Sequence, residues 1–201
     1  MRNISHALGW LVAIALTGCS ADYARLEPSY PLSPASNSAL ERSSGIEVVA
    51  NANTWRGSEA VNRDLLPIEL VITNRSQGPI HVGHQDVNLI EPSGIVAARS
   101  PRAIRPRVQP ITMGLSPIEI DPEAGNAAAP PPPTPEESAE ADVREEALRE
   151  APIAPGQITR GFVYFPRVSK DVTHVDLRVI ARDRPGGRAV AVLVVPFDVV
   201  R

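Results

Sequence analysis

Cysteine and aromatic residues are scarce in this sequence of 201 residues, and each shortage excludes a class of structure. The single cysteine, Cys19, excludes an internal disulfide, a four-cysteine zinc site and a Cys-x-x-Cys redox motif. Aromatic residues make up 4% of the chain, so a core has to be built mainly from Val, Ile and Leu. The length allows one ordinary domain with tails, and the 21 prolines predict long irregular connections.

The chain also lacks a strong excess of charge and an apolar run long enough to cross a membrane. Its 20 basic and 23 acidic side chains leave a net charge of -3, which gives no reason to expect nucleic acid as a partner. Any function based on charge must therefore be local. The N-terminal apolar run, residues 7–16, is too short to span a bilayer as a helix but matches the core of a signal peptide.

The apolar run is followed directly by the sequence Leu16-Thr17-Gly18-Cys19. This sequence resembles the bacterial lipobox, in which a hydrophobic residue and two small residues precede an invariant cysteine. The resemblance implies that a diacylglyceryl group is attached to the Cys19 sulfur and that the chain is cleaved after Gly18. In the enterobacterial sorting pattern an aspartate at the next position retains a lipoprotein at the inner membrane, so the resemblance implies the outer membrane for a chain with Ser20. The alternative is an uncleaved hydrophobic anchor in which the cysteine is incidental.

Composition divides the rest of the chain into a tether, a folded part and an insert. Residues 19–44 are rich in Ser, Pro and Ala without sustained periodicity, which predicts a disordered tether behind the signal peptide of residues 1–18. Residues 45–201 are then expected to form one β-sandwich, interrupted by an irregular insert at about residues 99–151. The tether is expected to hold the sandwich at a distance from the membrane.

Several short segments with period-two alternation or β-branched composition predict strands. The clearest is residues 65–73, where Leu66, Ile68, Leu70 and Ile72 share one face and Pro67 must lie near the strand start or at an edge. Turn sequences separate this segment from the others, which are residues 45–51, 80–84, 86–91, 95–98, 158–165, 172–181 and 188–200. Seven or eight strands of this kind predict an all-β, immunoglobulin-like antiparallel sandwich.

Two of these segments resemble a known family. Pro155-Gly156 followed by Gly161-Phe162-Val163-Tyr164-Phe165-Pro166 is similar to the strand signature of the telokin-like immunoglobulin-fold domains of small bacterial lipoproteins. Residues 66–76 are similar to the long strand of that family, which ends in Asn. The resemblance covers about half of the chain. It implies a fold and a location but no shared catalytic residues, and the insert at about residues 99–151 departs from the family pattern.

The insert has a basic part and an acidic part. Its basic part carries Arg99, Arg102, Arg105 and Arg107, and a polyproline-like conformation would place the first three on one side. Its acidic Pro/Ala-rich part, residues 121–152, is expected to be flexible and to hold no core residue. The second half of that part predicts a short, mostly solvated helix with a weak stripe formed by Ala139, Val143 and Ala147.

Candidate sites are few. His81 and His84, with Asp86 nearby, point to opposite faces if they lie on a strand, so we expect no metal site. The sequence holds no nucleophile elbow, phosphate-binding glycine loop, metalloprotease motif or dinucleotide fingerprint. Pairs of Asp and Glu occur notably in the acidic insert, where they are expected to be neither buried nor rigidly held. We therefore expect no enzyme activity, no catalytic residue and no cofactor.

Two sets of side chains are candidates for a binding surface. The four arginines of the insert suit phosphate or carboxylate groups, although they could instead neutralise the neighbouring acidic residues. Phe162 and Tyr164 point away from the core if Val163 and Phe165 face it, and exposed aromatic side chains can anchor a partner. The alternative is that the insert or the tether covers both aromatic rings, or that both faces of the strand are buried.

Together these features predict a non-catalytic lipoprotein of the bacterial cell envelope. The sandwich would act as an accessory or protein-interaction module, held on a membrane through Cys19 and contacting another envelope protein. The alternative is a ligand-binding lipoprotein that captures an anionic small molecule or glycan. A hydrolase is a remote third hypothesis. A cleft lined by arginines would favour the ligand-binding function, and a flat aromatic surface would favour a protein partner. The oligomeric state is not predicted.

Overall fold

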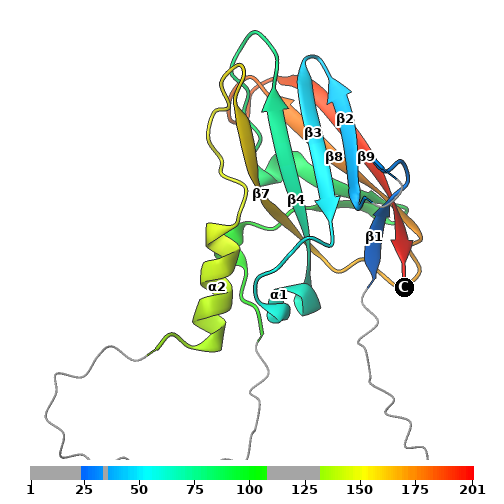
Figure 1. Ribbon diagram of the computed structural model, residues 1–201, viewed down its shortest axis with the longest axis vertical. Helices are drawn as coiled ribbons and strands as arrows, with labels where there is room; N and C mark the ends of the chain where they lie inside the picture. The colour runs from blue at the N-terminus through cyan, green and yellow to red at the C-terminus, as the bar shows by residue number, and fades with distance from the viewer. Residues whose placement is uncertain (1–23, 34–35, 108–131) are drawn as a thin grey trace, which may run out of the picture.

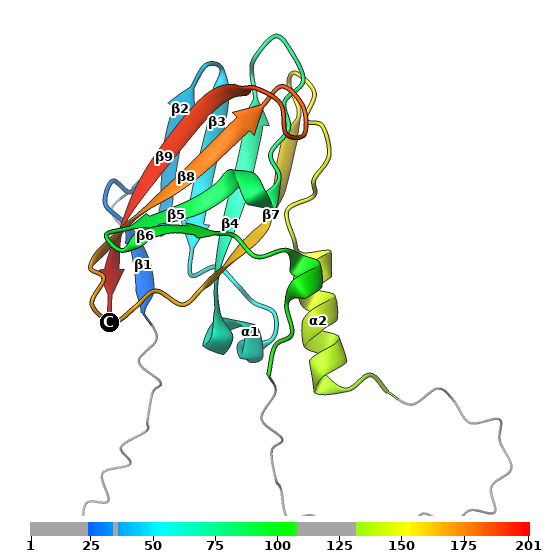
Figure 2. The same ribbon diagram turned by 180° about the vertical axis from the view of Figure 1, so that it is seen from behind.

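The computed structural model describes residues 24–33, 36–107 and 132–201, and these fold into two antiparallel β-sheets packed face to face (Figures 1 and 2). One sheet has the strand order β1-β9-β8-β5-β6, and the other has the order β2-β3-β4-β7. The predicted all-β sandwich is confirmed, with nine strands in the described part instead of seven or eight. The strands are β1 (Arg25–Pro28), β2 (Ser38–Ser43), β3 (Ile46–Ala52), β4 (Leu65–Asn74), β5 (Val87–Glu91), β6 (Gly94–Ala97), β7 (Ile158–Pro166), β8 (His174–Arg182) and β9 (Ala189–Val200).

Alternation along the strands places the core between the two sheets. On β4 the predicted face is buried, and its four side chains are at most 4% exposed: Leu66, Ile68, Leu70 and Ile72. Pro67 lies before the first β4 residue that pairs with β3, so its missing amide hydrogen removes no bond to that strand. On β7, Val163 and Phe165 face the same core. The two inner faces together form the principal hydrophobic core.

The predicted tether boundary at residue 44 is wrong, because β1 and β2 lie within residues 19–44 and belong to the sandwich. Strand β1 pairs with the end of β9, where Arg25 lies opposite Val200. Strand β2 pairs with β3 in the other sheet. Leu26 on β1 and Ala39 on β2 are buried in the principal core. The sandwich therefore begins at Arg25, and these two strands escaped prediction because each is short and carries a single buried side chain of the principal core.

The segment around the paired histidines is not the strand that residues 80–84 predicted. It makes two isolated bridges, Ile80 with Ile153 and His81 with Arg182, and then forms the 3-10 turn η1 (His84–Asp86). Asp86 is buried, accepts a hydrogen bond from the Gly83 amide at 3.2 Å, and pairs with Arg182. A buried carboxylate that binds an amide in this way favours a turn over an extended strand.

Two α-helices lie at one end of the sandwich (Figure 1). Helix α1 (Glu59–Asp64) is capped by the Ser58 side chain, which accepts a hydrogen bond from the Ala60 amide at 3.3 Å. Helix α2 (Pro135–Glu145) has a capping box in which Thr134 and Glu137 each accept a hydrogen bond from the other's amide. Its sequence therefore supplies a clear N-terminus for the helix predicted in the insert.

The prediction that the insert holds no core residue is wrong. Of the predicted stripe, Ala139 and Val143 lie on α2 and are fully buried, whereas Ala147 follows the helix and is half-buried. Leu148, which follows α2, belongs to the principal core. A second, smaller core forms where α2 and the turn η2 (Pro101–Ala103) pack against the outer face of β7. It consists of Trp55, Val61, Leu65, Ile104, Val143, Phe162 and Tyr164.

Candidate functional site

Phe162 and Tyr164 do not form an exposed aromatic surface, so that prediction is wrong. Alternation along β7 does direct both rings away from the principal core. However, Phe162 is 8% exposed and Tyr164 is 0% exposed, because α2 and the turn η2 cover them. The Trp55 ring lies edge-on to both, with ring centroids 5.0 Å from Phe162 and 5.7 Å from Tyr164. The Tyr164 hydroxyl donates to the Val143 carbonyl at 3.1 Å. The alternative that the insert covers the rings is the one observed.

Burial raises the pKa of Tyr164 above its ordinary value, and the nearby carboxylates of Glu146 and Asp142 raise it further. The hydroxyl therefore stays protonated and available for its bond to α2. Nothing about this tyrosine suggests an activated nucleophile, since its phenolate is disfavoured. Its role in the described structure is to fasten β7 to the C-terminal half of α2.

The four arginines of the insert are divided between two clefts. Arg99, Arg105 and Arg107 line a cleft of about 390 Å³ together with Arg63 of α1. Arg102 lines a different cleft, beside Arg144, Arg149 and Glu150. The polyproline-like arrangement is wrong because residues 101–103 form the 3-10 turn η2, with Pro101 in its first turn. Of the four arginines that were predicted to form one surface, the structure places three in the same cleft.

One of the arginines neutralises the acidic helix. The Arg105 Nε lies 3.2 Å from a Glu140 carboxylate oxygen, and the other oxygen of Glu140 pairs with Arg144. The Arg105 guanidinium also donates to the carbonyls of Arg102 and Ile104, each at 3.0 Å. The neutralising alternative therefore holds for Arg105. Within the described residues, the guanidinium groups of Arg63 and Arg99 make no such pair.

A second arginine-lined cleft lies on the other side of α1. It has a volume of about 510 Å³ and is lined by Arg25, Arg56 and Arg167, with Glu27 and Glu59 as its carboxylates. Sequence reasoning missed this group because β1, the loop before α1 and the residue after β7 are far apart along the chain. Arg167 donates to the Ala24 carbonyl at 3.2 Å and so fixes the residue that leads into β1.

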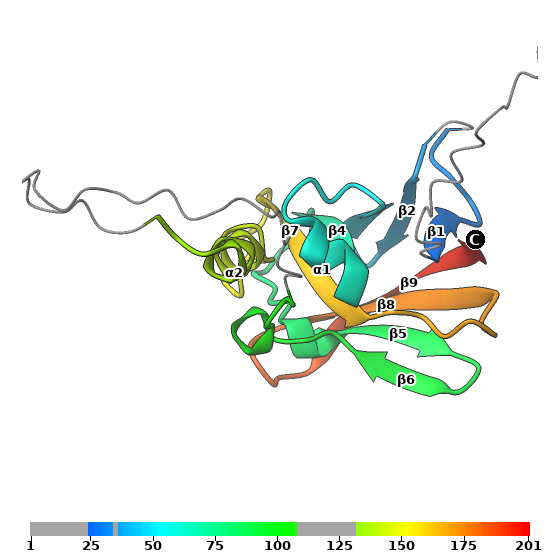
Figure 3. The same cartoon turned by 90° about the horizontal axis from the view of Figure 1, so that it is seen from below.

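The two clefts together form one end of the sandwich, here called the arginine end. It is seen from below in Figure 3, where α1 lies between α2 and β1. The lining residues of the two clefts include seven arginines and three carboxylates, the latter being Glu27, Glu59 and Asp64. The arginines are Arg25, Arg56, Arg167, Arg63, Arg99, Arg105 and Arg107. Such a concentration of guanidinium groups can hold phosphate or carboxylate groups.

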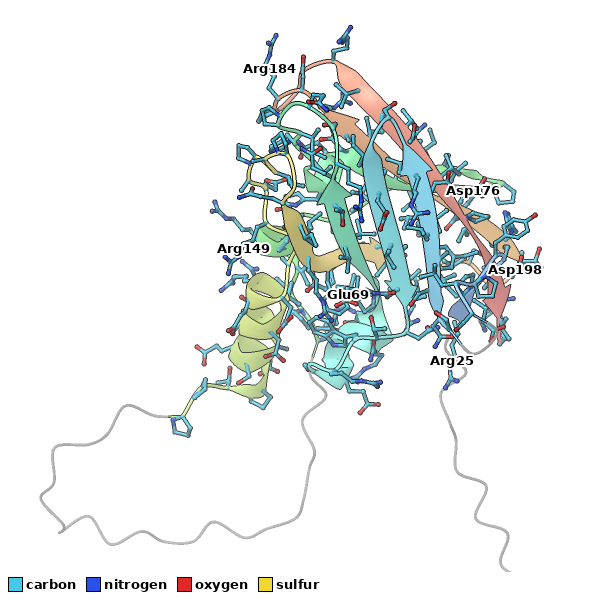
Figure 4. The ribbon with its side chains drawn as sticks, turned by 45° about the horizontal axis from the view of Figure 1, so that its top comes forward. Arg25, Glu69, Arg149, Asp176, Arg184 and Asp198 are labelled. Carbon is cyan, nitrogen blue, oxygen red and sulfur yellow. The ribbon has the colours of Figure 1, made fainter. Side chains whose placement is uncertain are left out.

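A further cleft, of about 770 Å³, lies beside the end of α2 on the outer face of the β2-β3-β4-β7 sheet. Its most buried charged residue, Glu69, is 3% exposed (Figure 4). One carboxylate oxygen of Glu69 pairs with Arg160 at 2.5 Å, and the other accepts a hydrogen bond from Asn51 at 2.7 Å. These bonds join β3, β4 and β7. With both oxygens engaged, Glu69 holds the three strands together.

The two histidines of the candidate metal motif have separate partners. His84 Nε2 lies 3.1 Å from Glu150, and the nearby Asp86 pairs with Arg182. His81 is buried, and its backbone bridges Arg182. Across residues 24–33, 36–107 and 132–201, no group of three potential ligands could hold a metal ion.

A further histidine, His174, lies between two carboxylates at the start of β8. Its Nδ1 is 3.1 Å from Asp198, which lies opposite it on β9, and its Nε2 is 3.2 Å from Asp176. Figure 4 labels both aspartates. The hydrogen bond to Asp198 raises the pKa of His174 above 6.5, burial lowers it by less, and Asp176 raises it further. The sequence gives no local signal for this cluster, because Asp198 comes from another strand.

We expect the His174 pKa, measured by NMR titration, to lie above 6.5 in the wild type and to fall in Asp198→Asn. Because the folded pKa is raised, the stabilising effect of protonated His174 is fully present below pH 6.5 and is lost as the pH rises through the folded pKa. The matched variant Asp176→Asn should also lower the pKa, and its hydrogen bond to His174 contributes less than that of Asp198. A wild-type pKa at or below 6.5 would contradict this arrangement.

The predicted lipid-attachment residue Cys19 and its lipobox neighbours Leu16, Thr17 and Gly18 lie outside the described residues. None of the helices in the described part is long and apolar enough to cross a membrane. No family model, curated protein or solved structure matches this chain. The N-terminal motif and the arginine end are therefore the two features of the chain that bear on its function.

Proposed function

We propose that this chain is a non-catalytic lipoprotein of the bacterial cell envelope, with an immunoglobulin-like sandwich that acts as an interaction module near the outer membrane. The lipobox-like sequence that ends in Cys19 carries the proposal, because a short apolar run before it suits a cleaved signal and not a membrane-spanning helix. Two or three acyl chains at Cys19 would hold the module on a membrane almost permanently. The arginine end supports a binding role, since the guanidinium groups of Arg25, Arg56 and Arg63 make no hydrogen bond or ion pair within the described residues.

Cys19→Ser is expected to abolish lipid attachment and to leave an unprocessed precursor. A serine hydroxyl cannot replace the thiol that receives the diacylglyceryl group. The measurement is metabolic labelling with radioactive palmitate, combined with an immunoblot that separates the precursor from the mature chain. Cys19 is the only cysteine, so any label in the wild type that disappears in the variant reports on this residue. Normal maturation of Cys19→Ser would refute the lipoprotein assignment.

A protein partner and an anionic ligand remain two candidates for what the module binds. The arginine-lined cleft of Arg63, Arg99 and Arg107 is the observation that favours an anionic ligand, and the burial of Phe162 and Tyr164 removes the aromatic surface that a protein partner would use. Both observations meet the criterion for an anionic ligand, which is therefore the favoured candidate. A protein partner is the second candidate because arginine is also enriched at protein interfaces.

In-cell crosslinking of the lipidated protein, followed by capture and mass spectrometry, separates these candidates. If the module binds a protein through its arginines, one specific partner is expected in the wild type and is expected to be lost when Arg63, Arg99 and Arg107 are changed to Gln. The matched control changes Arg42 and Arg75, which pair with Glu47 at another surface. Absence of any specific partner would favour the anionic ligand, and loss in the control as well would exclude these arginines as the binding surface.

A further inference from the structure

The arginine end has a charge opposite in sign to that of the whole chain. The full sequence has a net charge of -3, whereas the two clefts that flank α1 contain three carboxylates and six arginines besides Arg105, which pairs with Glu140. Arg25 and Arg56 are exposed and make no side-chain hydrogen bond or ion pair within the described residues. A local excess of exposed positive charge attracts an anionic surface even when the net charge of the protein is negative.

The position of this end relative to Cys19 is limited by the covalent chain. Strand β1 begins at Arg25, six residues after Cys19, and a chain of that length spans at most about 20 Å when fully extended. Arg25 lines one of the two clefts and lies opposite Val200, next to the C-terminus. Figure 1 shows the start of β1, the C-terminus and α1 at the same end of the sandwich. An anchor at Cys19 therefore keeps this end close to the lipid headgroups.

We propose that the arginine end docks on anionic phospholipid headgroups of the membrane that holds the lipid anchor. This inference rests on the proposed function, because it takes Cys19 as the anchored residue. The guanidinium groups of Arg25 and Arg56 bind the headgroup phosphates bidentately. Arg63 of α1 contributes a further guanidinium group from the second cleft. The sandwich then stands on this end, with the turn between β8 and β9 directed away from the membrane. In this arrangement a short connection joins Cys19 to β1 and the sandwich has a fixed orientation, in place of the long tether predicted from the sequence.

The experiment uses the mature lipidated protein in vesicles of phosphatidylcholine, with or without phosphatidylglycerol. Trp55 lines the same cleft as Arg25 and Arg56, and it is the only tryptophan left after cleavage because Trp10 precedes Cys19. A spin label on the lipid headgroup quenches Trp55 fluorescence when this end is docked. Stronger quenching is expected with phosphatidylglycerol, and added salt should reverse the gain.

Changing Arg25 and Arg56 to Gln should lower the ratio of docked to undocked molecules by about thirtyfold, as expected for two basic residues near an anionic surface. The control changes Arg184 and Arg188 to Gln in the turn between β8 and β9, at the opposite end of β9 from Val200 (Figure 4). This control removes the same charge and should leave quenching unchanged.

Mass spectrometry of the reconstituted protein separates two kinds of failure. If Cys19 carries no acyl chain, the proposed function and the docking both fail. If Cys19 is acylated but quenching is equal in the two lipid compositions, docking is refuted and the lipoprotein assignment stands. Equal loss of quenching in the Arg184 and Arg188 control would also refute docking at the arginine end.

Discussion

Replacing Gly161 by alanine is expected to destabilise the protein by about 3 kcal/mol, as overpacking does at a site that cannot adjust. A Cβ atom on Gly161 would meet the Leu148 backbone, and the Ala147 carbonyl carbon would lie 2.8 Å away. These contacts are with backbone, so no side-chain rotation relieves them. Gly161 therefore lets the chain that follows α2, which bridges β7 at Phe162, approach the strand closely enough for Leu148 to enter the principal core. Urea denaturation of the Gly161→Ala variant measures the loss.

The matched control for this prediction is Gly78→Ala. A Cβ on Gly78 meets nothing within 4 Å, so the change should alter the free energy of unfolding by no more than about 0.5 kcal/mol. Equal stability of Gly161→Ala and the wild type would show that the chain between α2 and β7 does not approach the strand closely. A loss in both variants would point to a general effect of removing glycine.

The core strands were predictable because their pattern is local. Leu66, Ile68, Leu70 and Ile72 alternate over the length of one strand, and that signal needs no partner. The same is true of Val163 and Phe165, which follow Gly161 at period two. Strand β1 has one buried non-proline side chain, Leu26, and becomes a strand only because the end of β9 supplies a pairing edge. Pairing between the two ends of the chain cannot be detected in a sequence segment of four residues.

For the aromatic side chains of β7, the local pattern predicts the face of the strand but not whether that face is exposed. Alternation correctly placed Phe162 and Tyr164 on the face of β7 opposite to the principal core. Whether that face is exposed depends on α2, which follows β6 by a long connection and packs there through Val143. The weak apolar stripe on the predicted helix was the available signal, because a helix with buried positions needs a surface to pack against.

The arginine end was predicted only in part, because only some of its residues are close in sequence. Arg99, Arg105 and Arg107 are close in sequence, and the structure keeps them in one cleft. Arg25 and Arg56 reach the same end of the sandwich from β1 and from the loop before α1. Their proximity is produced by sheet topology, which brings the first strand beside the last. Clusters built in this way are visible only in three dimensions.

The arginine end and the second core are linked through α1. Val61 of α1 is buried in the second core, while Arg63 of the same helix lines a cleft of the arginine end. Leu65, the first residue of β4, contributes to both. Packing of α2 against this region therefore positions the side chains that are proposed to contact headgroups. Loss of α2 should therefore affect both the stability of the sandwich and its docking on the membrane.

Deletion of residues 124–150 is expected to destabilise the sandwich by at least about 5 kcal/mol, because it removes α2 and empties the Leu148 position of the principal core. It also exposes Trp55 and Tyr164, which are 4% and 0% exposed in the intact protein. A domain of this size is stable by about 5–15 kcal/mol, so much of the deleted protein should lose its fixed packing. The measurements are the melting temperature and near-ultraviolet circular dichroism.

The control for this deletion changes the exposed helix residues Glu136 and Glu145 to alanine. These side chains lie outside the second core, so the free energy of unfolding should change by no more than about 0.5 kcal/mol. A deletion variant with the wild-type melting temperature would show that the sandwich is stable without α2 and that the aromatic side chains tolerate exposure. A large loss confined to the deletion would identify α2 as a structural part of the domain, since the strands beneath it cannot keep Trp55 and Tyr164 from water.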